Sequence, residues 1–168
     1  SVHTKFDHGI RIAYSKTEEV SSVHDIEHPL VRETLKLLNI DGGLEITSTA
    51  DIPGKGTGLG SSSSYTVGLI SALNAHNRIS IPTSRLAEMA CEVEIYKCEE
   101  PIGKQDQYAA AFGGLNLLEF APDDEVIVSP VLCSNVFKDI MNENTLIFYT
   151  GKVRSASKIL AEQTRISG

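Results

Sequence analysis

The sequence predicts one α+β domain, because helix-like and strand-like patterns are mixed along the chain without regular strand–helix–strand alternation. The composition is that of a globular protein, with 41% apolar and 22% charged residues in 168. The sequence contains no internal repeat, no low-complexity linker and no apolar run near the roughly 18 residues that a membrane span needs. A chain of this length can bury a core of its own.

The first third of the chain predicts two strands around one helix. Loose alternation of apolar residues over 5–15 predicts a strand that contains a turn, and the polar segment 16–27 is expected to be a loop. A helix is predicted over 28–43, with a proline in its first turn and a glycine pair at its end. Alternation over 44–50 predicts the second strand.

The rest of the chain predicts helices first and strands afterwards. Helices are expected at about 62–77, at 82–98 and, between glycines, over 103–114. The predicted strands cover 114–120, 125–131 and 144–151, and a last helix covers 155–165.

The net charge of −7 argues against a surface for nucleic acid or anionic membrane, since both need clustered Lys and Arg. It does not exclude phosphate ligands, because a few N–H groups and one cation can hold a phosphate on an acidic protein. The sequence shows no signal-peptide pattern. Cys91, Cys98 and Cys133 have no CxxC spacing, so reduced cysteines in a cytoplasmic protein are expected.

The segment 51–75, DIPGKGTGLGSSSSYTVGLISALNA, places four glycines and four serines directly before a predicted helix. The start of a helix presents unpaired N–H groups and a partial positive charge, and glycines let the preceding backbone curl around an anion. Serines there can cap the helix or offer oxygen to Mg²⁺. These properties suit a polyphosphate, although the Walker and dinucleotide patterns do not fit. A glycine-rich turn with a serine cap is the alternative.

The residues PGKGTGLGSSSS, 53–64, resemble the second signature of the GHMP kinases, a family named for galactokinase, homoserine kinase, mevalonate kinase and phosphomevalonate kinase. The resemblance implies that this loop wraps the phosphates of ATP and that a serine hydroxyl contacts Mg²⁺. The implied contacts to ATP are Pro53, Gly54, Gly56, Thr57, Gly58, Leu59, Gly60, Ser61, Ser62 and Ser63, and the implied metal contact among them is Ser62.

Glu94 is unusual on the helix predicted over 82–98. It falls at the margin of the apolar face, whereas Glu88, Glu92 and Glu99 cluster opposite. A carboxylate is seldom buried without a partner, and the alternative is a salt-bridged side chain at the surface. The resemblance implies a Mg²⁺ ligand, since a glutamate at about this distance before the catalytic loop binds Mg²⁺ in GHMP kinases.

Asp106 stands in EPIGKQDQYAAAFGG, where an aspartate between glycines is usually a turn or cap residue. In GHMP kinases a G-x-x-D segment places an aspartate beside the acceptor hydroxyl. The resemblance therefore implies that Asp106 is catalytic, either as the base that takes the hydroxyl proton or as a group that orients the nucleophile. Gly103, Lys104 and Gln105 are implied neighbours of the substrate, with a solvated side chain as the alternative for Lys104.

Longer segments, among them 26–75, 100–116 and FYTGKVRSASKIL at 148–160, resemble the GHMP kinases that phosphorylate the anomeric hydroxyl of a heptose 7-phosphate. This implies an ATP- and Mg²⁺-dependent sugar kinase of nucleotide-activated heptose biosynthesis. Fucokinases and galactokinases share much of this sequence, so another sugar kinase is one alternative. A non-catalytic nucleotide- or sugar-binding module is a second. The negative net charge argues against a third alternative, an RNA-binding domain.

Two further motifs each have a functional and a structural interpretation. Thr150 and Arg154 follow a predicted strand and suit contacts with the phosphate of the acceptor, but they also fit an exposed basic turn. HDIEH at 24–28 matches a zinc-protease pattern that needs both histidines on one helix. Because Pro29 disfavours the helical conformation at His28, these histidines are expected to be loop and cap residues.

The resemblance also implies a fold like the second domain of ribosomal protein S5, in incomplete form. Residues 1–150 would form the ATP-binding N-terminal domain of a GHMP kinase without its first strands, and 151–168 the start of a truncated C-terminal region. Ser1 in place of Met also suggests a central fragment, which is expected to be inactive alone. The sequence leaves the oligomeric state open, a homodimer included.

Overall fold

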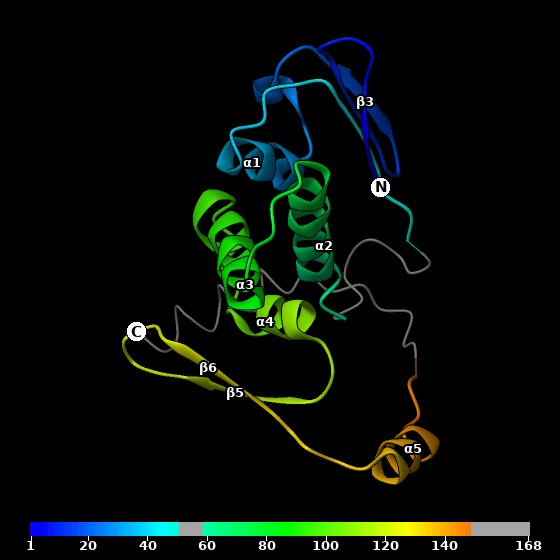
Figure 1. The fold of residues 1–168 in the computed structure, drawn as a ribbon, viewed down its shortest axis with the longest axis vertical. Helices are drawn as coiled ribbons and strands as arrows, with labels where there is room; N and C mark the ends of the chain where they lie inside the picture. Colours follow the sequence, from blue (N-terminus) through cyan, green and yellow to red (C-terminus); the bar gives the residue numbers. More distant parts are fainter. Residues whose placement is uncertain (51–58, 149–168) are drawn as a thin grey trace.

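The structure, a computed structural model, describes residues 1–50 and 59–148. A four-stranded sheet is followed by a group of helices, a β-hairpin and a separate last helix (Figure 1). The strands are β1 (Val2–Thr4), β2 (Ile10–Ala13), β3 (Thr17–Val20), β4 (Leu44–Thr47), β5 (Asn116–Phe120) and β6 (Val126–Pro130). The helices are η1 (Val23–Asp25, 3₁₀), α1 (Pro29–Leu37), α2 (Ser61–His76), α3 (Thr83–Cys91), η2 (Glu92–Lys97, π), α4 (Gln105–Phe112) and α5 (Asn135–Glu143). The α+β class is therefore confirmed.

The larger sheet has the strand order β1-β4-β2-β3, in which β2 and β4 are parallel and the outer pairs are antiparallel. Parallel strands need a crossover, and here β3, η1 and α1 form it. The register pairs Ile10 with Leu44 and Ile12 with Ile46, which puts all four side chains on one face. That face is the buried one.

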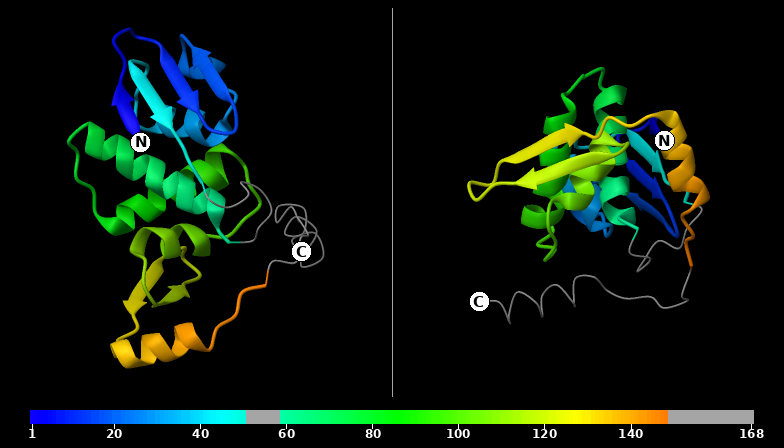
Figure 2. Two further views of the ribbon diagram at one scale, coloured as in Figure 1. Left: turned by 90° about the vertical axis from the view of Figure 1, so that its right-hand side faces the viewer. Right: turned by 90° about the horizontal axis from the view of Figure 1, so that it is seen from below.

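Helix α2 packs against two parts of the core, one under the sheet and one among the helices. In Figure 1 it lies below the sheet and beside α3, and the left view of Figure 2 also shows it below the sheet. Leu69 and Leu73 pack with the buried face of the sheet and with α1. Val67 and Ile70 pack with Val93 and other residues of α3 and η2. Because α2 has buried residues on more than one side, the sheet and the neighbouring helices both hold it. This packing also fixes the position of its first turn, at Ser61.

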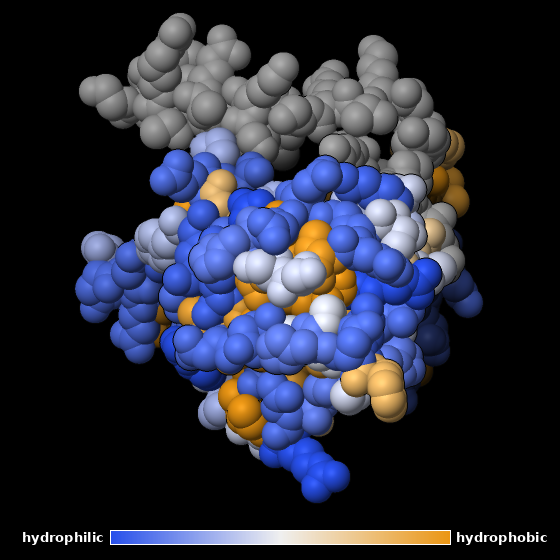
Figure 3. Space-filling view, turned by 90° about the horizontal axis from the view of Figure 1, so that it is seen from above, coloured by the Kyte–Doolittle hydropathy of each residue, from blue (hydrophilic) through white to orange (hydrophobic). Residues whose placement is uncertain are grey.

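Charged side chains lie on the face of the larger sheet that points away from the core. On this face, Arg11 Nη1 donates to Glu45 Oε1 at 2.6 Å. The end of the molecule that carries this sheet is mostly hydrophilic, with small hydrophobic areas (Figure 3). None of the helices in the described ranges is both long and apolar enough to cross a bilayer.

The β5–β6 hairpin packs beneath α4, where Leu118, Val126 and Val128 contact the cluster around Tyr108 (Figure 1). Helix α5 follows, and none of its residues is buried. Ser134 caps this helix by accepting a hydrogen bond from the Phe137 N–H at 3.2 Å. The sequence analysis predicted the two strands of the hairpin but no helix over 135–143.

Several sequence predictions are corrected by the structure. The strand expected over 5–15 is present only at Ile10–Ala13, and a separate strand, Val2–Thr4, precedes it. The segment 16–27 is not a loop, because Thr17–Val20 pairs with β2; the polar sequence conceals this strand, since its buried residue is a glutamate. Helix α1 ends at Leu37, before the glycine pair, because the following backbone turns to a φ of 52° at Asn39. The helix predicted over 82–98 changes to a π-helix after Cys91. Residues 145–148 form no strand. The last part of the predicted strand, 149–151, lies outside the described residues, as does the predicted helix 155–165.

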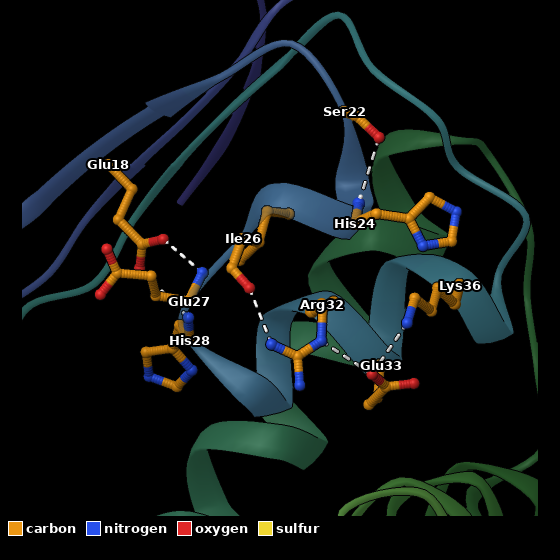
Figure 4. Close-up of polar contacts among 9 residues, drawn as sticks. All are labelled: Glu18, Ser22, His24, Ile26, Glu27, His28, Arg32, Glu33 and Lys36. Atoms are coloured by element: carbon orange, nitrogen blue, oxygen red, sulfur yellow. Dashed lines mark hydrogen bonds and ion pairs between the residues drawn. The ribbon is translucent and has the colours of Figure 1, made fainter.

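The buried carboxylate of Glu18 joins β3 to the start of α1 (Figure 4). It accepts hydrogen bonds from the Tyr14 hydroxyl at 2.8 Å, the Glu27 N–H at 2.6 Å and the His28 N–H at 3.2 Å. Burial raises the pKa of Glu18, but the hydrogen bonds from Glu27 and Tyr14 and the nearby Lys16 outweigh it and hold the pKa below the ordinary 4.5.

Replacing Glu18 with alanine is expected to cost about 1–3 kcal/mol of unfolding free energy, because two backbone N–H groups lose their acceptor. Since the folded pKa is lowered, the stabilisation by Glu18 is complete above pH 4.5 and declines as the pH falls through the folded pKa. Urea titrations at neutral and acidic pH measure both effects. Glu19→Ala on the same strand is the control and should cost at most about 1 kcal/mol, because the partner of Glu19 within the described residues is Arg11, in an exposed ion pair. A Glu18→Ala loss that persists undiminished at low pH would contradict this account.

Candidate functional site

The start of α2 is an open helix N-terminus. Gly60 precedes it with φ 64° and ψ 27°, a left-handed conformation that glycine adopts readily. Within the described part of the chain, no side chain caps this end of the helix. Ser62 and Ser64 are exposed, Ser61 is half-buried and Ser63 is buried. The first turn therefore offers amide groups and the Ser62 hydroxyl to a ligand.

Asp106 lies directly against this N-terminus. It is an exposed residue in the first turn of α4. A Cβ atom placed on Gly60 would be 3.3 Å from Asp106 Oδ2 and 3.4 Å from its Cγ. The backbone at Gly60 and the carboxylate of Asp106 are thus in close contact, although 46 positions separate them in the sequence. An anion held by the α2 amides would lie beside this carboxylate.

Glu94 is buried, with 1% of its surface exposed. The π-helix η2 carries it, and Val93 in the same helix belongs to the core cluster with α2. Gln107 Nε2, in α4, donates a hydrogen bond to Glu94 Oε2 at 2.5 Å. Sequence periodicity had put Glu94 at the margin of the apolar face; the wider π-helical turn accompanies its full burial.

The residues so far described come from three elements that pack on one another. Helix α4 contacts both α2 and α3, so Asp106 reaches the start of α2 while Gln107 reaches Glu94. This arrangement combines free amides, an exposed hydroxyl and two carboxylates. Such groups suit a phosphate-bearing ligand with a divalent cation.

Residues 28–114 match the model of the family described as GHMP kinases N terminal domain, which is more than half of the 168 residues. The chain belongs to the GHMP kinases. The matched range contains α2, η2 and α4, the elements that carry the candidate site.

Two curated relatives are sugar kinases by name. The chain is 36% identical to the D-glycero-alpha-D-manno-heptose 7-phosphate kinase of Campylobacter jejuni over 110 residues, 66% of this chain and 32% of that protein. It is 34% identical to the galactokinase of Pyrococcus furiosus over 143 residues, 82% of this chain and 36% of that protein. The chain thus spans about a third of the length of these GHMP kinases.

Solved GHMP kinase structures share the fold. A D-glycero-D-manno-heptose 1-phosphate kinase from Bacteroides thetaiotaomicron superimposes with a TM-score of 0.74 and 28% identity, over 83% of this chain and 49% of that one. The Methanococcus jannaschii mevalonate kinase gives a TM-score of 0.58 at 20% identity, over 69% of this chain and 41% of that one, and supports the fold alone.

The predicted substrate neighbours at the start of α4 divide into two kinds. Gly103 and Gln105 are exposed. Lys104 pairs instead with Asp124 in the turn of the β5–β6 hairpin, with Nζ 2.9 Å from Oδ1. The hydrogen bond that it donates to Asp124 raises the pKa of Lys104 above its usual value. As placed here, the Lys104 ammonium joins the start of α4 to the hairpin.

Lys104→Met and Asp124→Asn are each expected to lower the unfolding free energy by about 0.2–1 kcal/mol, because Asp124 is largely exposed and solvent weakens the pair. The double variant should lose no more than the larger single loss, since both changes remove one interaction. Urea unfolding of the four proteins measures this. Fully additive losses would show that Lys104 and Asp124 act separately and would contradict the pairing.

Seven predicted site residues lie outside the described residues: Pro53, Gly54, Gly56, Thr57, Gly58, Thr150 and Arg154. Leu59 is described and is 59% exposed. The division between domains at 150 also falls outside and stays a prediction. His24 lies in η1 and His28 is the N-cap of α1, so the two histidines of the zinc-protease pattern are on separate elements, as expected from Pro29.

Sequence reasoning missed Gln107 and Asp124. Gln107 follows Asp106 directly, and a signal was available: a long polar residue beside the apolar run that starts at Tyr108. For Asp124 the sequence offered only a polar turn between two predicted strands. Its pairing with Lys104 depends on where the hairpin packs.

Proposed function

We propose that the intact protein is an ATP-dependent sugar kinase that transfers the γ-phosphoryl group of ATP to a sugar hydroxyl. The observation that carries the proposal is the contact of the Asp106 carboxylate with Gly60 at the start of α2, inside a GHMP kinase N-terminal domain. This proximity supports the proposal, because a carboxylate can accept a proton and a helix N-terminus suits phosphates.

The roles proposed for the residues follow from their positions. The amides at the start of α2, from Gly60 to Ser63, would bind the phosphates of ATP, which supplies the transferred group. Asp106 would take the proton of the acceptor hydroxyl, or orient that hydroxyl, as it attacks. The remaining predicted contacts complete the proposal: Thr150 and Arg154 for the sugar phosphate, and Pro53, Gly54, Gly56, Thr57, Gly58 and Leu59 for ATP.

The residues present also fit Mg²⁺. Glu94 is a buried carboxylate whose hydrogen bond in the described structure comes from a neutral amide, and burial of a charge favours a compensating partner. A carboxylate and a hydroxyl are oxygen ligands of the kind that Mg²⁺ prefers, so Glu94 and Ser62 would hold it. The cation would neutralise charge on the phosphates.

For the acceptor we propose D-glycero-D-manno-heptose 7-phosphate, phosphorylated at its anomeric hydroxyl in the biosynthesis of nucleotide-activated heptose. The names of the Campylobacter jejuni relative and of the Bacteroides structure support a heptose phosphate. A galactokinase-like or fucokinase-like activity is the second candidate, favoured by the Pyrococcus furiosus galactokinase, whose match covers more of this chain. Such an enzyme would act in the cytoplasm on a small molecule, as a monomer or a homodimer.

The test is an assay of the intact protein with ATP, Mg²⁺ and a panel of D-glycero-D-manno-heptose 7-phosphate, galactose and fucose, followed by ADP release. Turnover of the heptose phosphate above the other sugars is the expected result. Turnover of unphosphorylated hexoses alone would replace the heptose assignment by the second candidate. Nucleotide and sugar binding without turnover of any sugar would favour a non-catalytic module.

A further inference from the structure

Gln107 is fully buried in α4, one position after Asp106. Its Nε2 donates to Glu94 Oε2 at 2.5 Å. Its Oε1 is buried too, and it has no hydrogen-bond partner among the residues that the structure describes. A buried amide oxygen without a partner is costly, so this atom indicates that a donor belongs beside it.

Glu94 shows the complementary pattern. Gln107 Nε2 donates a hydrogen bond to one oxygen of its carboxylate, Oε2, and none of the hydrogen bonds among the described residues reaches the other oxygen, Oε1. A hydrogen bond to one oxygen fixes the rotation of the carboxyl group and therefore the direction of the second oxygen. Without Gln107, a carboxylate at the end of a flexible side chain would have no such constraint.

Resting on the proposed kinase function, we propose that Gln107 is a positioning residue for the cation site. Its Nε2 would hold the Glu94 carboxylate so that Glu94 Oε1 is free for a divalent cation, and its own buried Oε1 would accept a hydrogen bond from a donor that enters the site with the ligand. Partners of this kind orient metal ligands and tune the affinity for the metal. Gln107 touches neither ATP nor the sugar in this proposal, and its effect passes through Glu94.

The position of Gln107 in α4 explains why the cation site and the proton acceptor would be assembled together. Asp106 and Gln107 are consecutive residues of one helical turn. Asp106 contacts the start of α2, and Gln107 contacts η2. A displacement of α4 would therefore disturb the proton acceptor and the metal ligand at once.

The experiment titrates Mg²⁺ into the intact protein in the presence of a non-hydrolysable ATP analogue and follows binding by calorimetry. Gln107→Met, which keeps the length of the side chain but removes the donor, is expected to raise the apparent Kd for Mg²⁺ by about 10–100-fold. Gln107→Asn keeps the amide with a shorter reach and should fall between Gln107→Met and the wild type. It also serves where Gln107→Met does not fold.

Asn74→Leu is the matched control. Asn74 is another buried amide, which donates to its own helix at Ile70 O, and it lies about 20 Å along α2 from Ser61. The Mg²⁺ affinity of this variant should equal that of the wild type.

A second measurement uses no metal or nucleotide. The melting temperatures of Gln107→Met, Glu94→Gln and the double variant should show coupling, because both changes alter one interaction. Unchanged Mg²⁺ affinity in both Gln107 variants would overturn the positioning role and leave the kinase proposal standing. If the wild type binds no Mg²⁺–nucleotide, the kinase proposal fails and the role of Gln107 at a cation site fails with it, whereas independent melting effects would overturn the Glu94–Gln107 pairing itself.

Discussion

Asp106→Asn is expected to lower kcat of the intact protein by about 10²–10⁴-fold while the fold stays intact, because an amide cannot take the proton of the acceptor hydroxyl. Asparagine has nearly the same size as aspartate, so the packing against Gly60 should be kept. Asp106 is exposed, and its replacement therefore leaves no buried group without a partner. ADP release at saturating ATP and sugar measures the effect.

Asp139→Asn is the control for this prediction. Asp139 is an exposed aspartate of α5, a helix without buried residues, so its replacement should leave kcat unchanged. The affinity of Asp106→Asn for the nucleotide should be close to that of the wild type, because the amides of α2 are untouched. A kcat within a few-fold of the wild type would leave Asp106 with an orienting role at most.

The sequence predicted those elements whose local pattern agrees with their environment in the fold. Helix α2 begins and ends within one residue of its predicted limits, and the β5–β6 hairpin falls where alternation placed it. Strand β3 was missed, because its inward residue is Glu18, and a pattern based on hydrophobicity cannot recognise a buried carboxylate that is satisfied by the backbone of a later segment.

The same distinction applies to the candidate site: the sequence indicates which residues take part, but not how far apart they lie. A motif can indicate that Gly60, Glu94 and Asp106 serve one site, but their distances depend on the packing of α4 against α2 and α3. The contact of Asp106 with Gly60 and the hydrogen bond of Gln107 to Glu94 are long-range consequences of that packing. The π-helix at Glu92–Lys97 is a further example, since no local residue pattern distinguished it from the α-helix that precedes it.

Gly60→Ala is expected to impair both stability and turnover. With φ at 64°, a residue that has a Cβ atom is disfavoured by roughly 1–2 kcal/mol. The new Cβ would also lie 3.3 Å from Asp106 Oδ2, which is closer than most contacts of a Cβ atom, so the carboxylate must shift slightly. Because small displacements of a reacting group are costly, kcat should fall by about 10–100-fold.

Gly68→Ala on the same helix is expected to have the opposite effect on stability. Gly68 lies in the interior of α2, and a Cβ atom there would meet nothing within 4 Å. Alanine in a helix interior is favoured over glycine by about 0.5–1 kcal/mol, so this variant should unfold at higher urea concentration with unchanged kcat. Urea unfolding and ADP release on both variants compare one chemical change at two places. If Gly60→Ala were as stable and as active as Gly68→Ala, neither the left-handed turn nor the contact with Asp106 would matter to the site, whereas opposite signs would locate the requirement for glycine at the start of α2.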